Sequence, residues 1–156
     1  MLFLYHAGEI KMDIQIRKCE ITDAKAIYEL NLKEMGYDYP YDKTVEKLLQ
    51  LLKSGKDKVL VALVDNAVVG YVHANDYDVI YAPHMKNIMG IAVSGCCKKK
   101  GIGRALLSAV EDWARKSGAH GIRLVSGSAR TDAHEFYRHC GYTGDKQQIN
   151  FKKILI

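Results

Sequence analysis

The stretch that decides the fold runs Ile88-Met89-Gly90-Ile91-Ala92-Val93-Ser94-Gly95-Cys96-Cys97-Lys98-Lys99-Lys100-Gly101-Ile102-Gly103-Arg104-Ala105. The apolar run 88–93 predicts a buried strand, and the basic loop after it contains two glycines. Apolar residues then recur at helical spacing, at Ile102, Ala105, Leu106, Ala109, Val110 and Trp113. This spacing predicts an amphipathic helix that begins directly after the loop.

The loop itself predicts a phosphate-binding site. Backbone N–H groups at a helix start have no intrahelical acceptor and lie at the positive end of the helix dipole. Gly101 and Gly103 allow close approach of a ligand, and the lysines 98–100 add positive charge. The structural alternative is a simple glycine turn beside a solvated lysine run, and the loop alone does not decide between the two.

Two blocks together resemble the GNAT-type N-acetyltransferase superfamily. The first is the acetyl-CoA-binding pattern: Val93, four residues, a basic residue, two residues, then Gly101-x-Gly103 before a helix. The second, residues 130–142, resembles the later helix of the family, with its Phe136-Tyr137 pair and a final glycine and aromatic residue. This block is most similar to the branch that contains aminoalkylphosphonate and some aminoglycoside N-acetyltransferases.

The resemblance covers Met12 to the C-terminus and implies an α/β (α+β) fold. In this GNAT fold a central mixed, mainly antiparallel sheet of six to seven strands is flanked by about four helices. Hydrophobic periodicity and turn residues agree with that order. The predicted strands are 14–17, 59–64, 67–74, 88–93, 122–126 and 149–154, with a hairpin turn at 65–66. The predicted helices are 22–35, one capped by Thr44, one after the glycine loop, and one around 136–137.

Composition indicates one compact domain. The chain has 156 residues, of which 48% are hydrophobic, enough for a single core. We expect an N-terminal extension of unknown role at residues 1–11 and a single N-acetyltransferase domain at 12–156. The four cysteines show no disulfide framework and no secretory signal precedes them, which favours reduced thiols and a cytoplasmic location. No apolar run is long enough to span a membrane.

The net charge of the chain and the spacing of its histidines and cysteines indicate which ligands it can bind. A net charge of +5 suits a polyanionic ligand, and nucleic acid is the competing interpretation. Basic residues are scattered apart from 98–100, and no nucleic-acid-binding motif is present, so we expect no nucleic acid partner. Histidines and cysteines lack metal-ligand spacing, so we expect no metal.

The resemblance implies direct transfer of an acetyl group from acetyl-CoA, as cosubstrate, to a primary amine, with a small molecule as the preferred acceptor. Two alternatives stay open: a CoA-binding regulatory protein without turnover, and an acetyltransferase for protein or peptide amines. A homodimer through the C-terminal strand or the N-terminal extension is a further expectation.

The family also implies roles for individual residues. Tyr137 is the expected general acid, which protonates the CoA thiolate, although its helical spacing also fits a core aromatic. The strand residues expected to hold the pantetheine arm, at a bulge, are Ile91, Ala92 and Val93. The other expected cofactor-binding residues are Lys98, Lys99, Lys100, Gly101, Ile102, Gly103, Arg104, Arg130 and Tyr137.

Three positions depart from the family pattern. Gly90 stands where many relatives carry a glutamate that acts as base, which leaves the general base open. Lys98 replaces the usual Arg or Gln, and Arg130 stands near a frequent asparagine. The alternative candidates for the base are His73, Asp76, Asp78, His84, Glu34, Asp38 and bulk water.

The segment 36–42 is rich in tyrosine and aspartate and borders the acceptor cleft in this fold. Aromatic faces and carboxylates attract ammonium groups, so it predicts a small amine or polyamine-like acceptor, with an exposed turn as the alternative. The substrate-binding candidates are Tyr37, Asp38, Tyr39 and Asp76. A rival mechanism would use Cys96 or Cys97 as a thiol that is acetylated first, or as a redox sensor.

Overall fold

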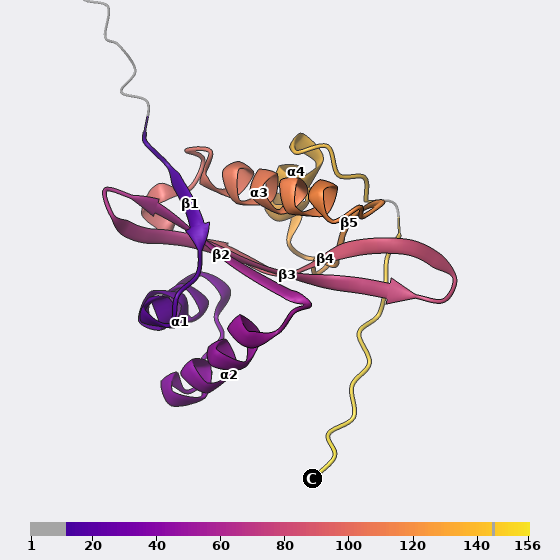
Figure 1. Cartoon of the computed structure of the whole chain (residues 1–156), viewed down its shortest axis with the longest axis horizontal. Coiled ribbons are helices and arrows are strands. Elements are labelled where there is room, and N and C mark those ends of the chain that lie inside the picture. Colours follow the sequence, from indigo (N-terminus) through magenta and orange to yellow (C-terminus); the bar gives the residue numbers. More distant parts are fainter. Residues whose placement is uncertain (1–11, 145) are drawn as a thin grey trace, which may run out of the picture. The chain divides into compact units, whose positions relative to one another are not determined.

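The computed structural model of the protein describes residues 12–144 and 146–156, so the predicted N-terminal extension at 1–11 lies outside the described residues (Figure 1). The chain forms two compact units, Met1–Arg123 and Leu124–Ile156. The strands are β1 (Gln15–Lys18), β2 (Asp57–Val64), β3 (Ala67–Val79), β4 (Ala82–Val93) and β5 (Gly121–Leu124). The helices are α1 (Ala24–Leu30), α2 (Tyr41–Lys53), α3 (Ile102–Lys116) and α4 (Thr131–His139), with short turns η1 (Ile21–Asp23), η2 (Asn31–Met35) and η3 (Gly95–Cys97).

The five strands form one sheet in the order β1-β2-β3-β4-β5, and the pairs β1–β2, β2–β3 and β3–β4 are antiparallel. The predicted α/β architecture with a mainly antiparallel sheet is therefore confirmed. The predicted hairpin turn is also present, because Asp65 and Asn66 adopt positive φ angles of 50° and 63° between β2 and β3. The strand count is five among the described residues, not six to seven.

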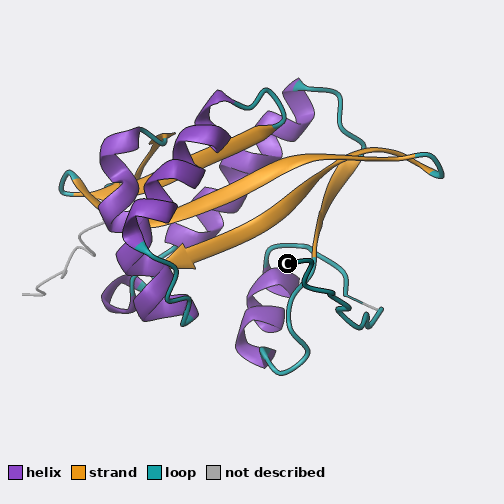
Figure 2. Cartoon of the chain, turned by 90° about the horizontal axis from the view of Figure 1, so that it is seen from below, coloured by secondary structure: helices purple, strands orange, loops and turns teal. Residues whose placement is uncertain are grey.

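Both faces of the sheet are covered in the first unit. Alternate residues of β2, namely Val59, Val61 and Leu63, belong to a buried cluster with residues of α1 and α2. The intervening Leu60 and Ala62 point to the other face, because side chains alternate along a strand. Figure 1 shows α3 on that second side, and the same layers appear in the turned view of Figure 2.

Helix α3 packs closely against the sheet at Gly70 of β3. A Cβ added there would lie 3.0 Å from the carbonyl oxygen of Ala92 and 3.3 Å from side-chain atoms of Ile102 and Leu106. A larger residue would push α3 away from β3. The start of α3, and with it the glycine loop, is thus set by a backbone contact on the sheet.

Two helix starts differ from the predictions. Helix α2 begins at Tyr41, directly after Pro40, and the hydroxyl of Thr44 donates to the Pro40 carbonyl within the first turn at 3.1 Å. Thr44 is therefore not its cap; the fixed φ of Pro40 suits a helix start. The first helical segment begins at η1, where the Asp23 carboxylate accepts the Glu20 N–H at 2.8 Å, instead of at Thr22. Gly36, with φ 71°, ends this segment as predicted.

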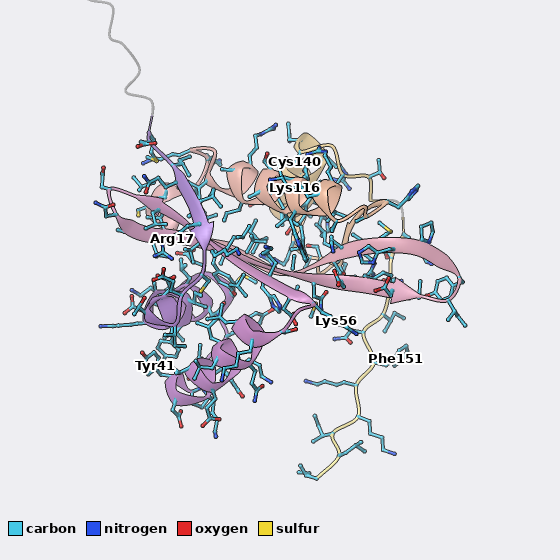
Figure 3. The ribbon with its side chains drawn as sticks, viewed as in Figure 1. Arg17, Tyr41, Lys56, Lys116, Cys140 and Phe151 are labelled. Atoms are coloured by element: carbon cyan, nitrogen blue, oxygen red, sulfur yellow. The ribbon has the colours of Figure 1, made fainter. Side chains whose placement is uncertain are left out.

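The predicted closing strand at 149–154 is wrong. Residues 146–156 form no helix or strand, and Phe151 is 86% exposed on an extended ribbon (Figure 3). A strand is stable only when its N–H and C=O groups pair with a neighbouring strand. Within the described part of the second unit, the only strand residue is Leu124 at the end of β5, so the alternating apolar pattern has no partner there.

Truncation of Leu106 is expected to destabilise the first unit strongly. Leu106 lies on the buried side of α3, and removing three heavy atoms leaves a cavity that neighbours fill only in part. We expect Leu106→Ala to lower the free energy of unfolding by about 2–5 kcal/mol. Denaturant unfolding followed by circular dichroism measures it; Leu49→Ala, at a 40% exposed position of α2, is the control and should cost clearly less.

Candidate active site

The glycine loop joins β4 to α3 in the first unit. Gly101 adopts a left-handed φ of 87° at the N-cap of α3, and no side chain caps this helix. No atom lies within 4 Å of a Cβ built on Gly101, so the backbone is open to a ligand. Lys98, Lys99 and Lys100 are exposed around it. The loop thus offers helix-start N–H groups and positive charge to an anion.

Glu34 holds the beginning of this loop. One carboxylate oxygen accepts the backbone N–H of Gly95 at 2.7 Å, and the other lies 3.1 Å from the ammonium of Lys98. The hydrogen bond from Gly95, followed by the contact with Lys98, lowers the pKa of Glu34. Glu34 was one candidate for the general base. In the structure its ionised carboxylate extends from η2 and holds the beginning of the loop through Gly95 and Lys98.

Strand β4 carries a bulge near the centre of the sheet. Gly90 pairs with His73 and Ile88 pairs with Ala74, so Met89 is left without a partner in β3. The bulge was expected at Ile91, Ala92 and Val93, but these residues pair in register with β3, and the irregularity lies just before them. Gly90, which stands in place of the family glutamate, is directly opposite His73.

A cavity of about 210 Å³ opens beside this bulge, on the sheet face that α1 and α2 cover. Its walls come from α1, η2, the 37–39 segment, α2 and strands β2 to β4. Tyr37 and Tyr39 line it, as the sequence predicted for an acceptor site. Asp38 and Asp76 are not among the lining residues, so the structure does not bring the two predicted acids to this cavity.

Asp76 lies on the opposite face of the sheet. Its carboxylate is 2.5 Å from the ammonium of Lys86, a lysine that is only 2% exposed and lies 4.0 Å from the centre of the Trp113 ring. Trp113 belongs to α3, which covers that face. The Asp76–Lys86 pair is therefore part of the packing under α3.

A histidine and an aspartate form a pair in the cavity wall. His73 Nε2 lies 2.8 Å from Asp57 Oδ1, and both side chains are largely buried, with 17% and 15% exposure. The hydroxyl of Ser54 donates to the second oxygen of Asp57 at 2.6 Å. Burial opposes ionisation of Asp57, but the hydrogen bonds from Ser54 and His73 outweigh it and lower the pKa of Asp57.

The hydrogen bond with Asp57 determines the orientation of the His73 ring and which of its nitrogen atoms carries the hydrogen. With an ionised Asp57 accepting from Nε2–H, the neutral ring carries its lone pair on Nδ1. His73 was one of several candidates for the base, whereas Ser54 and Asp57 were not predicted. Among the candidate bases, His73 is the one that lines the cavity; Asp78 and His84 pair with each other at 2.7 Å elsewhere in the β3–β4 hairpin.

The two adjacent cysteines lie in η3, beside the glycine loop. Their sulfur atoms are 3.4 Å apart, and Cys96 is also 3.4 Å from the Ser94 hydroxyl. The hydrogen bond with Ser94, followed by that with Cys97, lowers the pKa of Cys96. Neither cysteine lines the cavity.

The second unit contains the remaining predicted residues. Tyr137 lies on α4, with its ring centre 5.3 Å from that of Phe136 and 6.1 Å from that of Tyr142. Burial raises the pKa of Tyr137, so its phenol stays protonated at neutral pH. Arg130 is exposed at the N-cap of the same helix.

Two kinds of feature are absent from residues 12–144 and 146–156. No group of three or more histidine, cysteine, aspartate or glutamate side chains is arranged to hold a metal ion. None of the helices in these ranges has the length and apolar character needed to cross a membrane.

Comparison with known proteins shows which family the chain belongs to. Residues 24–142 match the acetyltransferase (GNAT) family. The chain belongs to this family, as its two sequence blocks suggested.

Individual relatives carry related names. An aminoglycoside N(6')-acetyltransferase type 1 of Stenotrophomonas maltophilia is 28% identical over 145 residues, which cover 90% of this chain and 93% of that protein. The uncharacterized N-acetyltransferase YhdJ of Bacillus subtilis is 44% identical over 50 residues, only 32% of this chain and 35% of that protein. The solved structure of aminoglycoside N-acetyltransferase AAC(6')-Iy in complex with CoA shares the fold, with a TM-score of 0.82 and 17% identity over 91% of this chain and 95% of that one.

Proposed function

We propose that the protein transfers an acetyl group from acetyl-CoA to a primary amine of a small molecule, by direct attack of the amine. One observation supports the proposal most directly: strand β4 connects the cavity, where the amine would bind, with the glycine loop, where the cofactor would bind. Gly90 and Met89 of β4 line the cavity, and three residues beyond Gly90 the same strand ends at Val93 and leads into the glycine loop. An amine in the cavity and a cofactor on the loop would share this strand.

The loop residues suit a ligand with several phosphates. The left-handed Gly101, the uncapped start of α3 and the exposed lysines 98–100 together favour a pyrophosphate. Acetyl-CoA supplies an activated acetyl thioester when bound. Within this proposal the backbone of Ile91, Ala92 and Val93 holds the pantetheine arm, and Arg130 adds positive charge.

The cavity supplies a base for the amine. A primary amine has a pKa near about 10.4 and arrives protonated, so it must lose a proton before it attacks. We assign this step to His73: Nδ1 accepts the proton, and the ionised Asp57 stabilises the imidazolium that forms. Ser54 keeps the Asp57 carboxylate in position. His73 thereby replaces the glutamate that is missing at position 90.

Tyr137 is the proposed general acid. Attack by the neutral amine forms the C–N bond, and collapse of the tetrahedral intermediate breaks the C–S bond. In this proposal the Tyr137 phenol protonates the departing CoA thiolate, and the remaining proton on the former amine nitrogen then restores the phenol. The raised pKa of Tyr137 keeps that proton available across the neutral range. The support for this role is the family motif around Phe136-Tyr137.

Calorimetric titration with acetyl-CoA, followed by an assay of thiol release with amines, tests the proposal. Saturable binding near one molecule per chain and release of CoA only in the presence of an amine are expected. Binding without amine-dependent release would instead support the alternative of a CoA-binding regulatory protein. An acetylated peptide amine, with no reaction of small amines, would support the protein acetyltransferase.

Substitution of Gly101 is expected to weaken acetyl-CoA binding. A β-branched residue at a φ of 87° costs about 1–2 kcal/mol and places methyl groups where the backbone should meet the pyrophosphate. We expect Gly101→Val to raise the Kd for acetyl-CoA about ten-fold or more, which corresponds to about 1.4 kcal/mol. Calorimetry measures this change.

Gly118→Val is the matched control, because Gly118 has φ 71°, equally open surroundings and a place at the other end of α3. It should lower stability by a similar amount and leave the Kd unchanged. Equal Kd values for both variants and the unmodified protein would contradict the assignment of the loop.

A further inference from the structure

We infer that the acceptor is a compact monoamine with an apolar or aromatic body, and not a polyamine or an aminosugar. The inference rests on the proposed function and names the substrate class of the same cavity. It departs from the polyamine-like acceptor that segment 36–42 predicted, and from the substrates that the names of the relatives suggest.

Six aromatic or sulfur-containing side chains of the described residues line the cavity, together with aliphatic residues of α1, α2 and β2. The six are Tyr28, Tyr37, Tyr39, Tyr71, Met35 and Met89. The hydroxyl of Tyr71 donates to the Asn31 side chain, so this polar pair is already satisfied, and burial raises the pKa of Tyr71 to about 12. The wall therefore offers flat, polarisable surfaces to an apolar body.

Charge in the cavity is unfavourable for several ammonium groups. No carboxylate of the described residues lines the cavity, and Lys47 contributes a positive charge. The carboxylate of Asp57, which contacts the lining residue His73, already accepts from His73 and Ser54. A polyamine or aminosugar would bring further ammonium groups to a wall that has no anion for them, and burial of an unpaired charge is costly.

One amino group is compatible with this wall. Tyrosine faces attract a single ammonium before its proton moves to His73. The amine, once deprotonated, is neutral and loses no ion pair. The site thus accepts one amino group and disfavours a second.

The volume of the cavity also favours a compact amine. An apolar cavity of about 150 Å³ in another protein holds a benzene ring. The cavity here, of about 210 Å³, exceeds that by roughly the volume of a short alkylamine chain. Two linked sugar rings would extend beyond this volume, out of the apolar walls and into solvent.

The test compares three amines with the full-length protein and acetyl-CoA: 2-phenylethylamine, putrescine and neamine. Formation of N-acetyl product is followed by mass spectrometry. We expect kcat/KM for 2-phenylethylamine to exceed that for either other amine about ten-fold or more. A larger kcat/KM for putrescine or neamine would overturn the inference and leave the proposed function standing. No product from any of the three, while acetyl-CoA binds, would overturn the inference; if a broad set of other small amines also gave no product, the proposed function would be overturned as well.

A charge reversal sharpens the test. Lys47→Glu places a carboxylate at the cavity and should raise kcat/KM for putrescine about ten-fold relative to 2-phenylethylamine. Lys43→Glu makes the same charge change one turn earlier on α2, outside the lining, and should shift this ratio less than about two-fold. Equal shifts in the two variants would overturn the inference, because they would reflect the net charge of the protein and not the cavity.

Discussion

Replacement of His73 by glutamine is expected to lower kcat about 100-fold at neutral pH, because a positioned general base contributes about 10²–10⁴-fold. Glutamine keeps a polar side chain of similar reach beside Asp57 but cannot take up a proton. Steady-state kinetics of thiol release measures the effect. The Kd for acetyl-CoA should not change, since the glycine loop is built from other residues.

The pH dependence separates a base from a structural role. As the pH rises toward the pKa of the amine, about 10.4, a growing fraction of substrate arrives neutral and needs no base. The deficit of His73→Gln should therefore shrink steadily with increasing pH. A loss through altered structure would persist at every pH and would contradict the assignment.

His84→Gln is the matched control. His84 also pairs with an aspartate, Asp78, at 2.7 Å, but it lies outside the cavity. We expect its kcat to stay within about two-fold of the unmodified protein, as for substitutions away from a site. A comparable loss in both variants would mean that the cavity position of His73 has no special importance.

Removal of the Tyr137 hydroxyl is also expected to lower kcat strongly. Tyr137→Phe keeps the ring contacts with Phe136 and Tyr142 but leaves no proton for the departing thiolate. We expect kcat to fall about 100-fold with an unchanged Kd for acetyl-CoA. Rapid-mixing kinetics with calorimetry provides both numbers.

Tyr81→Phe removes the hydroxyl of a residue that is 81% exposed, in the turn between β3 and β4; it serves as control and should have no effect on kcat. Because burial raises the pKa of Tyr137, the unmodified protein should keep its acid function to a higher pH than an ordinary tyrosine would allow. A Tyr137→Phe variant with full kcat would show that Tyr137 is a packing residue, the interpretation that helical spacing alone favours.

Local patterns were enough to predict most of the fold. The apolar alternation of β1, the valine-rich run of β2, the Asp65-Asn66 turn and the glycine before α3 each determine structure within a few residues. The prediction of a closing strand at 149–154 was wrong because a strand depends on more than its local pattern. Its alternating pattern at 149–154 is correct for a strand, but strand formation depends on a partner that no local pattern specifies.

The cavity wall was harder to predict because it depends on register. β2 and β3 pair regularly from Val64–Ala67 to Leu63–Val68, and then a bulge at Val69 shifts the register, so that Ala62 pairs with Gly70. Without this extra residue, His73 and Asp57 would point to opposite faces of the sheet. The local signal at Val69 is weak: Gly70 follows it, and an isolated glycine in a strand is compatible either with a bulge or with a close backbone approach. The pair, and with it the base, is visible only in three dimensions.

The contact of Glu34 with the glycine loop has the same origin. The two residues that meet, Glu34 and Gly95, are 61 positions apart in the chain. Chemistry alone made Glu34 a candidate base, and only the packing of η2 against the end of β4 gives it the role of an anchor.

The measurement that tests the central claim most directly is product analysis after incubation of the protein with acetyl-CoA and 2-phenylethylamine. The account predicts N-acetylated amine and free CoA in equal amounts, with almost none of either from the His73→Gln variant at neutral pH. Saturable acetyl-CoA binding without any N-acetylated amine from a broad set of small amines would contradict it.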